Sequence, residues 1–412
     1  MVIRGASVYT ENEVFEDKTI EITEDTFTDI REPSPVDLTV ENKINNKNKN
    51  IDINRNKNKE KNQNLNKNLN KDEEFIDVTE CYAIPGLIDI HFHGCMGVDF
   101  CDGDIESVRK IAEYEASQGV TSIIPATMTY DEDRLIKIAE TAKEFMGQNG
   151  RSATLYGINM EGPFVSIEKC GAQNPQYIHK PDYDMFKRIN SACGNKVKLV
   201  DIAPETDGAM EFIKKTSQDT RISIAHTTAD YETAVEAFEN GARQMTHLFN
   251  AMPGLHHRNP GPIAAAADRE DITAEIICDN VHITPVMVRM AFKLFGPKRL
   301  IFISDTMEAA GLEDGEYQLG GQPVTVRGKL ATLHDGTIAG SVTNLMKCMR
   351  TAVIDMGIPL TDAVRCATIN PAKAMGLYDE LGSITKGKKA DLVLLDKKTL
   401  SVKCVLIRGH LL

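Results

Sequence analysis

The most regular feature of the chain is the alternation of short apolar runs with stretches that have the spacing of amphipathic helices. After Asp104 and after Asp230, apolar residues recur three and four positions apart, and a glycine (Gly119 or Gly241) closes each stretch. An aspartate before such a stretch and a glycine after it are typical of helix ends. The apolar runs predict buried strands at residues 86–92, 120–126, 154–160, 197–202, 221–226, 243–247, 274–279 and 300–304.

Eight strands that alternate with helices predict an α/β fold, a (β/α)₈ TIM-like barrel, over residues 85–382. The competing arrangement is an open, doubly wound parallel sheet. That fold usually carries a Gly-x-Gly-x-x-Gly turn after its first strand, and this sequence has no such turn. The barrel is therefore the better prediction.

Residues 1–84 and 383–412 have a different pattern from this middle region. Their β-branched and aromatic residues are concentrated in short runs separated by turn-forming or polar residues, as is typical of strands. Because both ends share this pattern, we expect them to build one small β-sandwich domain together. The runs fall at residues 1–10, 14–23, 75–79, 391–395 and 402–407.

One segment of the N-terminal region, residues 42–71, stands apart from the rest by its composition. It contains 13 Asn and 8 Lys, and its net charge is +7. Such a segment buries too little apolar surface to offset the entropy of ordering, so we expect a disordered insertion whose deletion leaves activity intact. A basic arm that recruits a partner is the alternative, but no aromatic residue lies between the lysines.

Composition narrows the class of protein further. The 412 residues carry a net charge of −13, which argues against a nucleic-acid partner, although a local site can still bind a small anion. The nine cysteines have no spacing that suggests a disulfide framework. We find neither a signal-peptide pattern nor about 18 consecutive apolar residues. We therefore expect a cytoplasmic protein with no membrane partner.

Candidate chemistry gathers at the carboxyl ends of the predicted barrel strands, where barrel enzymes place their catalytic groups. Five of the ten histidines fall there. Side chains two apart on a strand share a face, so the histidines at 91 and 93 can reach one metal ion. Imidazole and carboxylate groups are suitable ligands for Zn²⁺ or Fe²⁺. We predict a site for a divalent metal, and we expect zinc or iron with one or two ions per subunit. Its ligands are His91, His93, Glu161, His226 and His247.

Each of these residues taken alone also has a structural explanation, because a single histidine at a strand end is often only a hydrogen-bonded residue. The structural explanation must hold at six strand ends at once, which makes the metal site the stronger hypothesis. Asp305, after the eighth strand, is placed to act as a general base. Arg258 is either a residue that binds an anionic group or an ordinary surface arginine. The reaction is then metal-assisted hydrolysis at an amide, a ring or an amine-bearing carbon.

Several motifs together give the sequence a recognisable resemblance. Residues 85–94, Pro-Gly-Leu-Ile-Asp-Ile-His-Phe-His-Gly, are similar to the metal-dependent amidohydrolase superfamily. From about residue 80 to the end, the order and spacing of the motifs resemble the family of N-acetylglucosamine-6-phosphate deacetylases. The further motifs are Met160-Glu-Gly-Pro-Phe, Ala225-His-Thr, Thr246-His-Leu-Phe-Asn-Ala-Met, Ile303-Ser-Asp and Ile338-Ala-Gly-Ser.

The resemblance implies hydrolysis of the N-acetyl group of an amino-sugar phosphate, with Asp305 as the catalytic base and acid and Glu161 bridging two metal ions. It also implies a homodimer in which Arg258 binds the sugar phosphate from the neighbouring subunit. The substrate-binding positions that it implies are Ala172, Gln173, Asn250, Ala251, Arg258, His282, Ile338, Ala339 and Gly340.

Two residues depart from the family pattern: Gln173 stands where many members have a histidine, and Asn280 replaces a usual glycine. Asn tolerates the left-handed conformation, so we expect the turn to survive. An amidohydrolase for a cyclic amide or for N-acetylgalactosamine 6-phosphate is the nearest alternative. A non-catalytic assembly protein is a further alternative, but it would be expected to have lost ligands, and none of the six site residues is missing.

Overall fold

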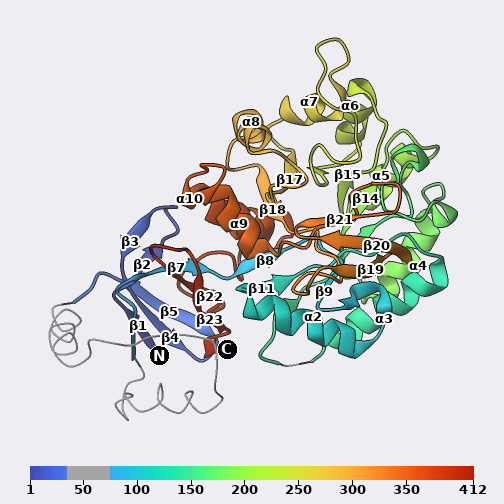
Figure 1. Ribbon diagram of the computed structural model, residues 1–412. Helices are drawn as coiled ribbons and strands as arrows, with labels where there is room; N and C mark the ends of the chain where they lie inside the picture. The colour runs from blue at the N-terminus through green and yellow to red at the C-terminus, as the bar shows by residue number, and fades with distance from the viewer. Residues whose placement is uncertain (35–74, 149) are drawn as a thin grey trace. The chain divides into compact units, whose positions relative to one another are not determined.

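The computed structural model describes residues 1–34, 75–148 and 150–412. The insertion predicted at residues 42–71 lies outside the described residues. The chain divides into two compact units (Figure 1). One unit combines Met1–Gly86 with Asp379–Leu412, and the other is formed by Leu87–Tyr378. We refer to them as the terminal unit and the barrel unit.

The described residues of the terminal unit form two sheets. The four-stranded sheet has the order β5-β4-β1-β6, and the six-stranded sheet has the order β24-β23-β22-β7-β2-β3. In the second sheet β7 pairs with β2 on one side and with β22 on the other, so strands from both ends of the chain share a sheet. The strands are β1 (Val2–Arg4), β2 (Ser7–Tyr9), β3 (Phe15–Asp17), β4 (Thr19–Thr23), β5 (Thr26–Arg31), β6 (Phe75–Asp77), β7 (Cys81–Pro85), β22 (Leu392–Asp396), β23 (Val402–Ile407) and β24 (His410–Leu411).

The core of the terminal unit contains apolar side chains from both of its sheets. Ile3 and Ile20 come from the four-stranded sheet, and Val8, Leu392 and Leu394 come from the six-stranded sheet. Leu392 and Leu394 are two residues apart and so point to the same face of β22. Val393 and Leu395, on the other face of β22, are buried as well, so this strand is apolar and buried on both faces.

The barrel unit contains parallel strands in two groups. One sheet has the order β12-β11-β8, and the other has the order β13-β14-β15-β16-β17-β18. Every pairing within these two sheets is parallel. The strands are β8 (Leu87–Asp89), β11 (Val120–Ile123), β12 (Thr154–Leu155), β13 (Ile158–Glu161), β14 (Val197–Ile202), β15 (Arg221–Ile224), β16 (Gln244–Met245), β17 (Thr273–Ile277) and β18 (Leu300–Ile303).

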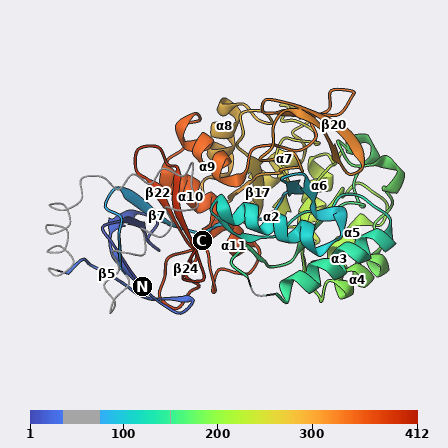
Figure 2. The ribbon, with the colours of Figure 1, turned by 60° about the horizontal axis from the view of Figure 1, so that its bottom comes forward.

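Helices connect these strands and lie around their outside (Figures 1 and 2). Asp104 caps the first of them by accepting hydrogen bonds from the backbone N–H groups of Glu106 and Ser107, each at 3.0 Å, and Asp230 caps α6. Both predicted caps are confirmed. The α-helices are α2 (Ile105–Ser117), α3 (Glu132–Met146), α4 (Tyr183–Ala192), α5 (Ala209–Thr216), α6 (Tyr231–Glu239), α7 (Gly261–Ala267), α8 (Pro285–Phe295), α9 (Leu345–Ile354), α10 (Leu360–Ala367) and α11 (Ile369–Ala374).

Hydrogen bonds just beyond the strand ends connect the two groups of strands. The Asp305 N–H donates to the His91 carbonyl at 2.9 Å, and the His93 N–H donates to the Thr306 carbonyl at 2.7 Å. On the other side Ala126 and Asn159 form a parallel bridge. The barrel unit therefore has a TIM-barrel-like α/β fold, which confirms the predicted fold class at this level.

Two of the predicted strands differ in detail from the observed ones. The run at residues 154–160 divides into β12 and β13, because the chain changes its pairing partner from β11 to β14 between them. The run at residues 243–247 is a strand only over β16, since the backbone turns at His247, whose φ is 29°.

A further sheet of the barrel unit follows β18. It is antiparallel and contains β19 (Gly315–Leu319), β20 (Gln322–Arg327) and β21 (Leu330–Thr332). A short hairpin of β9 (Gly94–Cys95) and β10 (Val98–Asp99) follows β8. None of the described helices combines the length and the apolar character that a membrane crossing needs.

Candidate metal centre and active site

The predicted ligands lie at or just after the carboxyl ends of four barrel strands. His91 and His93 follow β8, Glu161 ends β13, His226 follows β15, and His247 follows β16. All five side chains are buried. Parallel strands bring their carboxyl ends to one side of the unit, so residues up to 156 positions apart in the sequence meet there.

The backbone turns sharply where it presents several of these side chains. His226, His247 and Asp305 have φ values of 43°, 29° and 52°, in the left-handed region that non-glycine residues seldom adopt. The equivalent turn after Glu161 requires a glycine. Gly162 has a φ of 79°, and a Cβ at this position would lie only 2.0 Å from the Thr129 hydroxyl oxygen. Strained backbone is often found at functional sites, where the surrounding structure holds it in place.

Glu161 is at the centre of the cluster. Its Oε1 lies 3.0 Å from His226 Nε2, 3.3 Å from His247 Nε2 and 3.5 Å from His91 Nε2. Its other oxygen, Oε2, lies 3.3 Å from His93 Nε2. Burial raises the pKa of Glu161, but the surrounding imidazoles outweigh burial and hold this pKa well below its usual range. The carboxylate is therefore charged and available as a ligand.

The arrangement of nitrogen atoms fits a divalent cation. The Nε2 atoms of His226 and His247 lie 3.1 Å apart, and two nitrogen ligands of a tetrahedral zinc ion lie about 3.3 Å apart. His91 Nε2 is buried and has no hydrogen-bond partner in the described chain. Two ligand groups emerge, one of His91, His93 and Glu161 and one of Glu161, His226 and His247. They share Glu161, as the sequence hypothesis expected of a bridge.

Asp305 lies beside the ligand cluster, as predicted. Its Oδ1 is 3.3 Å from His93 Nε2 and 3.9 Å from His91 Nε2. Burial raises the pKa of Asp305, whereas the hydrogen bond from His93 and the charges of both histidines lower it, and the net shift is downward. Asp305 is thus a carboxylate at neutral pH and can accept a proton.

Contacts with other groups orient two of the histidines. His226 Nδ1 lies 2.8 Å from the Lys169 carbonyl oxygen, so Nδ1 carries the proton and Nε2 faces Glu161. His282 Nδ1 lies 2.8 Å from Asp279 Oδ2. Burial lowers the pKa of His282, but the hydrogen bond and the charge of Asp279 raise it by more, which favours the protonated imidazole.

Some of the predicted substrate-binding residues lie beside this cluster. Gln173 is buried, and its amide donates to Glu161 Oε2 at 2.8 Å. A Cβ on Gly340, at φ 66°, would lie 3.1 Å from the Asp305 carbonyl oxygen, so the 338–340 stretch passes close to Asp305. Ile338 is partly exposed and Ala339 is buried.

The other predicted substrate-binding residues make different contacts. The Asn250 amide donates to the His247 carbonyl at 3.1 Å, and the Ala251 carbonyl accepts from the Thr227 N–H at 3.0 Å. The Ala172 carbonyl accepts from the Gln322 amide at 2.6 Å. Arg258 lies on an exposed loop and has no ion-pair partner among the described residues. Within one chain, the structure does not bring Arg258 to the metal ligands.

Sequence reasoning missed several buried polar residues around the ligands. Glu275 Oε2 lies 3.1 Å from His91 Nδ1, and Asp201 Oδ2 lies 4.0 Å from the same nitrogen. Asp279 orients His282, and the Asn159 amide lies 3.2 Å from His91 Nδ1. The available signal was an acidic residue inside or at the end of an otherwise apolar strand, as with Glu275 in Thr-Ala-Glu-Ile-Ile.

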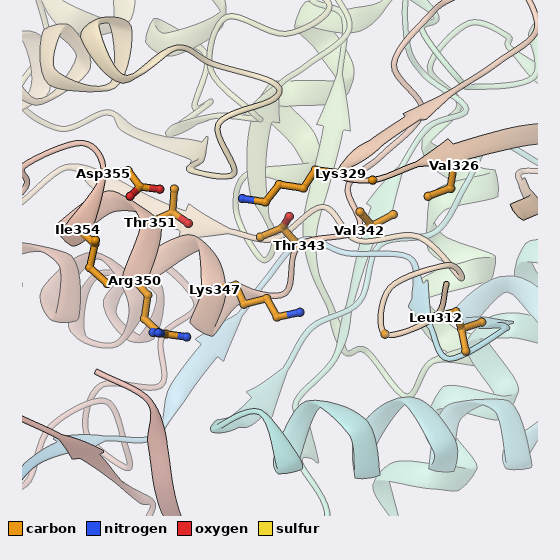
Figure 3. A pocket seen from close by; sticks show the side chains of 12 residues that line it. Leu312, Val326, Lys329, Val342, Thr343, Lys347, Arg350, Thr351, Ile354 and Asp355 are labelled. Atoms are coloured by element: carbon orange, nitrogen blue, oxygen red, sulfur yellow. The ribbon is translucent and has the colours of Figure 1, made fainter. Parts of the chain in front are cut away.

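The barrel unit also has a separate pocket of about 500 Å³ near the β19–β21 sheet and α9 (Figure 3). Lys329, Lys347 and Arg350 are among its lining residues. None of the predicted metal, catalytic or substrate-binding residues lines this pocket, so it is distinct from the cluster around Glu161.

Comparison with known proteins agrees with this geometry. The family model described as "Amidohydrolase family" matches residues 82–412. The chain therefore belongs to the amidohydrolase family. Within this family its relatives include N-acetylglucosamine-6-phosphate deacetylases. The enzyme of that name from Bacillus subtilis (strain 168) is 36% identical over 337 residues, which covers 81% of this chain and 85% of the Bacillus protein.

Other relatives and solved structures are similar. The N-acetylgalactosamine-6-phosphate deacetylase of Escherichia coli O157:H7 is 30% identical over 340 residues, covering 82% of this chain and 90% of that protein. A structure of the N-acetyl-D-glucosamine-6-phosphate deacetylase D267A mutant from Mycobacterium smegmatis, in complex with N-acetyl-D-glucosamine-6-phosphate, has a TM-score of 0.85 at 28% identity. That match covers 100% of this chain and 98% of the other.

Proposed function

We propose that the protein hydrolyses the N-acetyl group of N-acetylglucosamine 6-phosphate, giving glucosamine 6-phosphate and acetate. The observation that carries this proposal is the position of Glu161 among four imidazole nitrogens, with Asp305 Oδ1 3.3 Å from His93 Nε2. Relatives at 33–36% identity that bear this activity support the choice of substrate.

His91, His93, Glu161, His226 and His247 would hold the metal. A bound divalent cation lowers the pKa of a water molecule and polarises a carbonyl group. The Asp305 carboxylate accepts the proton of the water whose oxygen attacks the acetyl carbon. As the C–N bond breaks, Asp305 returns this proton to the departing amine nitrogen. His282, whose pKa is raised, is suited to donate a hydrogen bond to the carbonyl oxygen as negative charge develops there.

Recognition of the sugar phosphate belongs, in this proposal, to the residues beside the cluster and to the neighbouring subunit of a homodimer. Asn250 lies next to His247, Ala251 next to Thr227, and the 338–340 stretch next to Asp305. Arg258 lies on an exposed loop of its own chain. An exposed loop can reach a second copy, and a guanidinium group binds a phosphate through two parallel hydrogen bonds.

Several finer features remain part of the proposal. We infer zinc or iron as the metal, with one or two ions per subunit, because imidazole and carboxylate ligands suit both elements. We also infer a closed eight-stranded barrel, a β-sandwich in the terminal unit and a cytoplasmic location. The hydrogen bonds of Asp305 and His93 join the segments that follow β18 and β8, which supports closure of the barrel. The apolar core that lies between the two sheets of the terminal unit supports the sandwich.

The direct test is the release of acetate from N-acetylglucosamine 6-phosphate, with unphosphorylated N-acetylglucosamine measured alongside, both with and without a chelator. We expect turnover of the phosphorylated sugar alone, and we expect the chelator to abolish it. Metal-replete protein that releases no acetate would contradict the proposal.

The epimer is the main alternative, because a deacetylase for N-acetylgalactosamine 6-phosphate is 30% identical to this chain. Assaying both sugar phosphates under the same conditions separates the two functions. We expect the larger kcat/KM for the gluco epimer, and a larger value for the galacto epimer would replace the substrate while leaving the chemistry in place.

Mixing two defective variants tests whether Arg258 acts across a dimer. Arg258→Ala and Asp305→Asn should each have low activity at limiting substrate. If Arg258 of the partner subunit completes each site, subunit exchange between the variants restores one intact site per mixed dimer. About one quarter of wild-type activity would then return in a random mixture of two-fold dimers. Absence of any recovery after proven exchange would place Arg258 in its own subunit's site or outside it.

A further inference from the structure

A row of buried polar side chains crosses the interior of the barrel unit and ends at a metal ligand. Arg221 Nε donates to Gln244 Oε1 at 2.7 Å, and Gln244 Nε2 donates to Glu275 Oε1 at 2.6 Å. Glu275 Oε2 then lies 3.1 Å from His91 Nδ1. The residues come from the neighbouring strands β15, β16 and β17, and Gln244, Glu275 and His91 have no exposed surface.

The direction of each hydrogen bond in this row is determined by chemistry. An arginine can only donate, so the Gln244 oxygen faces Arg221, and the Thr273 hydroxyl, 3.2 Å from the same oxygen, is a second donor to it. The Gln244 NH₂ group therefore faces Glu275. A carboxylate can only accept, so the Nδ1 atom of His91 must carry the proton.

Two further groups lie near His91 Nδ1, and they differ in what they offer to it. Asp201 Oδ2, 4.0 Å away, is a further acceptor. The Asn159 amide lies 3.2 Å away with its nitrogen facing His91, while its oxygen has no partner in the described chain. The same Asn159 nitrogen lies 3.4 Å from the Ile90 carbonyl oxygen, which can only accept, so this nitrogen stays the donor end of the amide and makes no hydrogen bond to a protonated Nδ1. The bond to charged Glu275 is the stronger constraint.

We propose that Glu275 is a positioning residue that holds the Nδ1 proton of His91 and so leaves Nε2 free as a metal ligand. Arg221 fixes the orientation of the Gln244 amide, and the Gln244 NH₂ group occupies one oxygen of Glu275. The other oxygen of Glu275 is then the acceptor for His91 Nδ1. This inference rests on the proposed metal-dependent function, and it adds a residue outside the ligand set that controls the ion held by His91 and His93.

The two ligand groups differ in their dependence on this row. His226 obtains its orientation from the Lys169 carbonyl, which is not part of the row. Glu275 Oε2 also lies 3.4 Å from the backbone N–H of His247, but this contact involves no ring nitrogen. Loss of the Glu275 charge should therefore weaken the ion at His91 and His93 and leave the ion at Glu161, His226 and His247 bound.

The Glu275→Gln variant separates proton control from packing, because it keeps the shape of the side chain. Its amide oxygen would accept from Gln244, and its NH₂ group would face His91 Nδ1. His91 Nδ1 must then accept, which moves the ring proton to Nε2, the atom that should bind the ion. Changes to groups that orient a ligand typically cost about 10–100-fold in metal affinity. We expect a loss of this size for one of the two ions.

The double variant Gln244→Glu/Glu275→Gln reverses the polarity of the row without changing its total charge. Arg221 then pairs with the carboxylate introduced at position 244. The amide introduced at position 275 donates its NH₂ group to that carboxylate, and its oxygen accepts from His91 Nδ1. Metal affinity should recover. The Glu115→Gln variant controls for the replacement of a buried carboxyl group as such, since Glu115 is equally buried and lies outside the row, and it should bind both ions as the wild type does.

The experiment loads the purified full chain with Co²⁺ and measures ions per subunit by elemental analysis after dialysis against graded chelator. The visible absorption of bound Co²⁺ reports each ion separately. We expect two ions in the wild type, one in Glu275→Gln, and two again in the double variant. The proposal is overturned if the wild type binds a single ion at saturation, if Glu275→Gln retains both, or if the double variant fails to recover although its thermal unfolding matches the wild type. The acetate assay on wild-type protein tests the proposed function separately.

Discussion

The interiors of the two units are built on different principles. The core of the terminal unit is a cluster of isoleucine, leucine, valine and alanine side chains from two sheets. The interior of the barrel unit holds buried Asp, Glu, His, Asn and Gln side chains among its apolar strands. Apolar burial stabilises a fold roughly in proportion to area, whereas a buried charge costs free energy unless it is paired. Apolar burial therefore stabilises the terminal unit, whereas the polar groups of the candidate site lower the stability of the barrel unit.

The barrel unit limits this cost around the candidate site by pairing several of its buried polar groups with one another. Glu275 contacts His91 and Gln244, and Asp201 accepts a hydrogen bond from the Thr246 hydroxyl at 2.6 Å. Around Glu161, imidazole nitrogens gather in two groups, each of which could hold a cation. Substitutions at the candidate site of the barrel unit should therefore lower activity, whereas substitutions in the core of the terminal unit should lower stability. The expected effects are given from the largest to the smallest.

The Asp305→Asn variant should lose activity while keeping its stability. An amide cannot accept the proton of water, so we expect kcat to fall by about 10²–10⁴-fold. The melting temperature should change little, because asparagine has nearly the size and shape of aspartate and leaves no cavity. Acetate release and thermal unfolding measure the two properties, and the metal content serves as the control. Near-normal turnover in metal-loaded protein would remove Asp305 from the mechanism.

The Leu394→Ala variant should show the opposite behaviour. Leu394 is 1% exposed in β22, between β7 and β23. Truncating a buried leucine typically costs about 2–5 kcal/mol of unfolding free energy, while kcat per folded molecule should not change. Urea unfolding measures the loss, and Leu411→Ala, 39% exposed in the same sheet, is the control with a small expected effect. Equal losses in the two variants would show that burial of Leu394 is not what stabilises this unit.

Asp391 is a buried acidic residue within the terminal unit, and it makes the stability of this unit depend on pH. Asp391 Oδ1 accepts from the Arg408 N–H at 2.8 Å, while Oδ2 is buried and has no partner in the described chain. Burial raises the pKa of Asp391 from 3.8 to about 6. A folded-state pKa above the unfolded value means that this group favours folding most at low pH, and that its contribution falls as the pH rises from about 4 to 6.

The Asp391→Asn variant removes this titration. At pH 8 it should be more stable than the wild type by up to about 3 kcal/mol, the equivalent of a shift of two pKa units. At pH 4.5 the difference should shrink to about 1 kcal/mol. Urea unfolding of both proteins at the two pH values measures it, and a difference that does not change with pH would show that Asp391 titrates normally in the folded protein.

The Asp104→Ala variant should produce the smallest effect. Its carboxylate caps α2 through two backbone N–H groups, and the loss of such a cap costs about 1 kcal/mol. The exposed Glu113→Ala change on the same helix is the matched control, with an effect within about 0.5 kcal/mol. Acetate release should be unchanged in both. A stability loss of equal size in the control would show that helix composition, not capping, is responsible.

Much of the fold followed from local patterns in the sequence. The caps of α2 and α6 and most of the barrel strands depend on residues close together in the chain, so their spacing carries the signal. Strand limits were less accurate: the run at residues 154–160 divides in two because β12 and β13 pair with different strands. That choice depends on partners distant in the sequence, which a local pattern does not contain.

The candidate site shows the same division. The ligand residues could be predicted by position, because histidines and carboxylates at the ends of consecutive parallel strands must meet on one side. By itself the sequence determined the alternation of elements, the chemistry at the strand ends and the resemblance to amidohydrolases. Only the tertiary structure decided that Glu161 lies at the centre, that Gln173 contacts Glu161, and that Glu275 faces His91 across the interior. Glu275 and His91 are 184 positions apart in the chain, and the loop that carries Gln173 folds back on the end of β13, so these contacts exist only when the tertiary structure has formed.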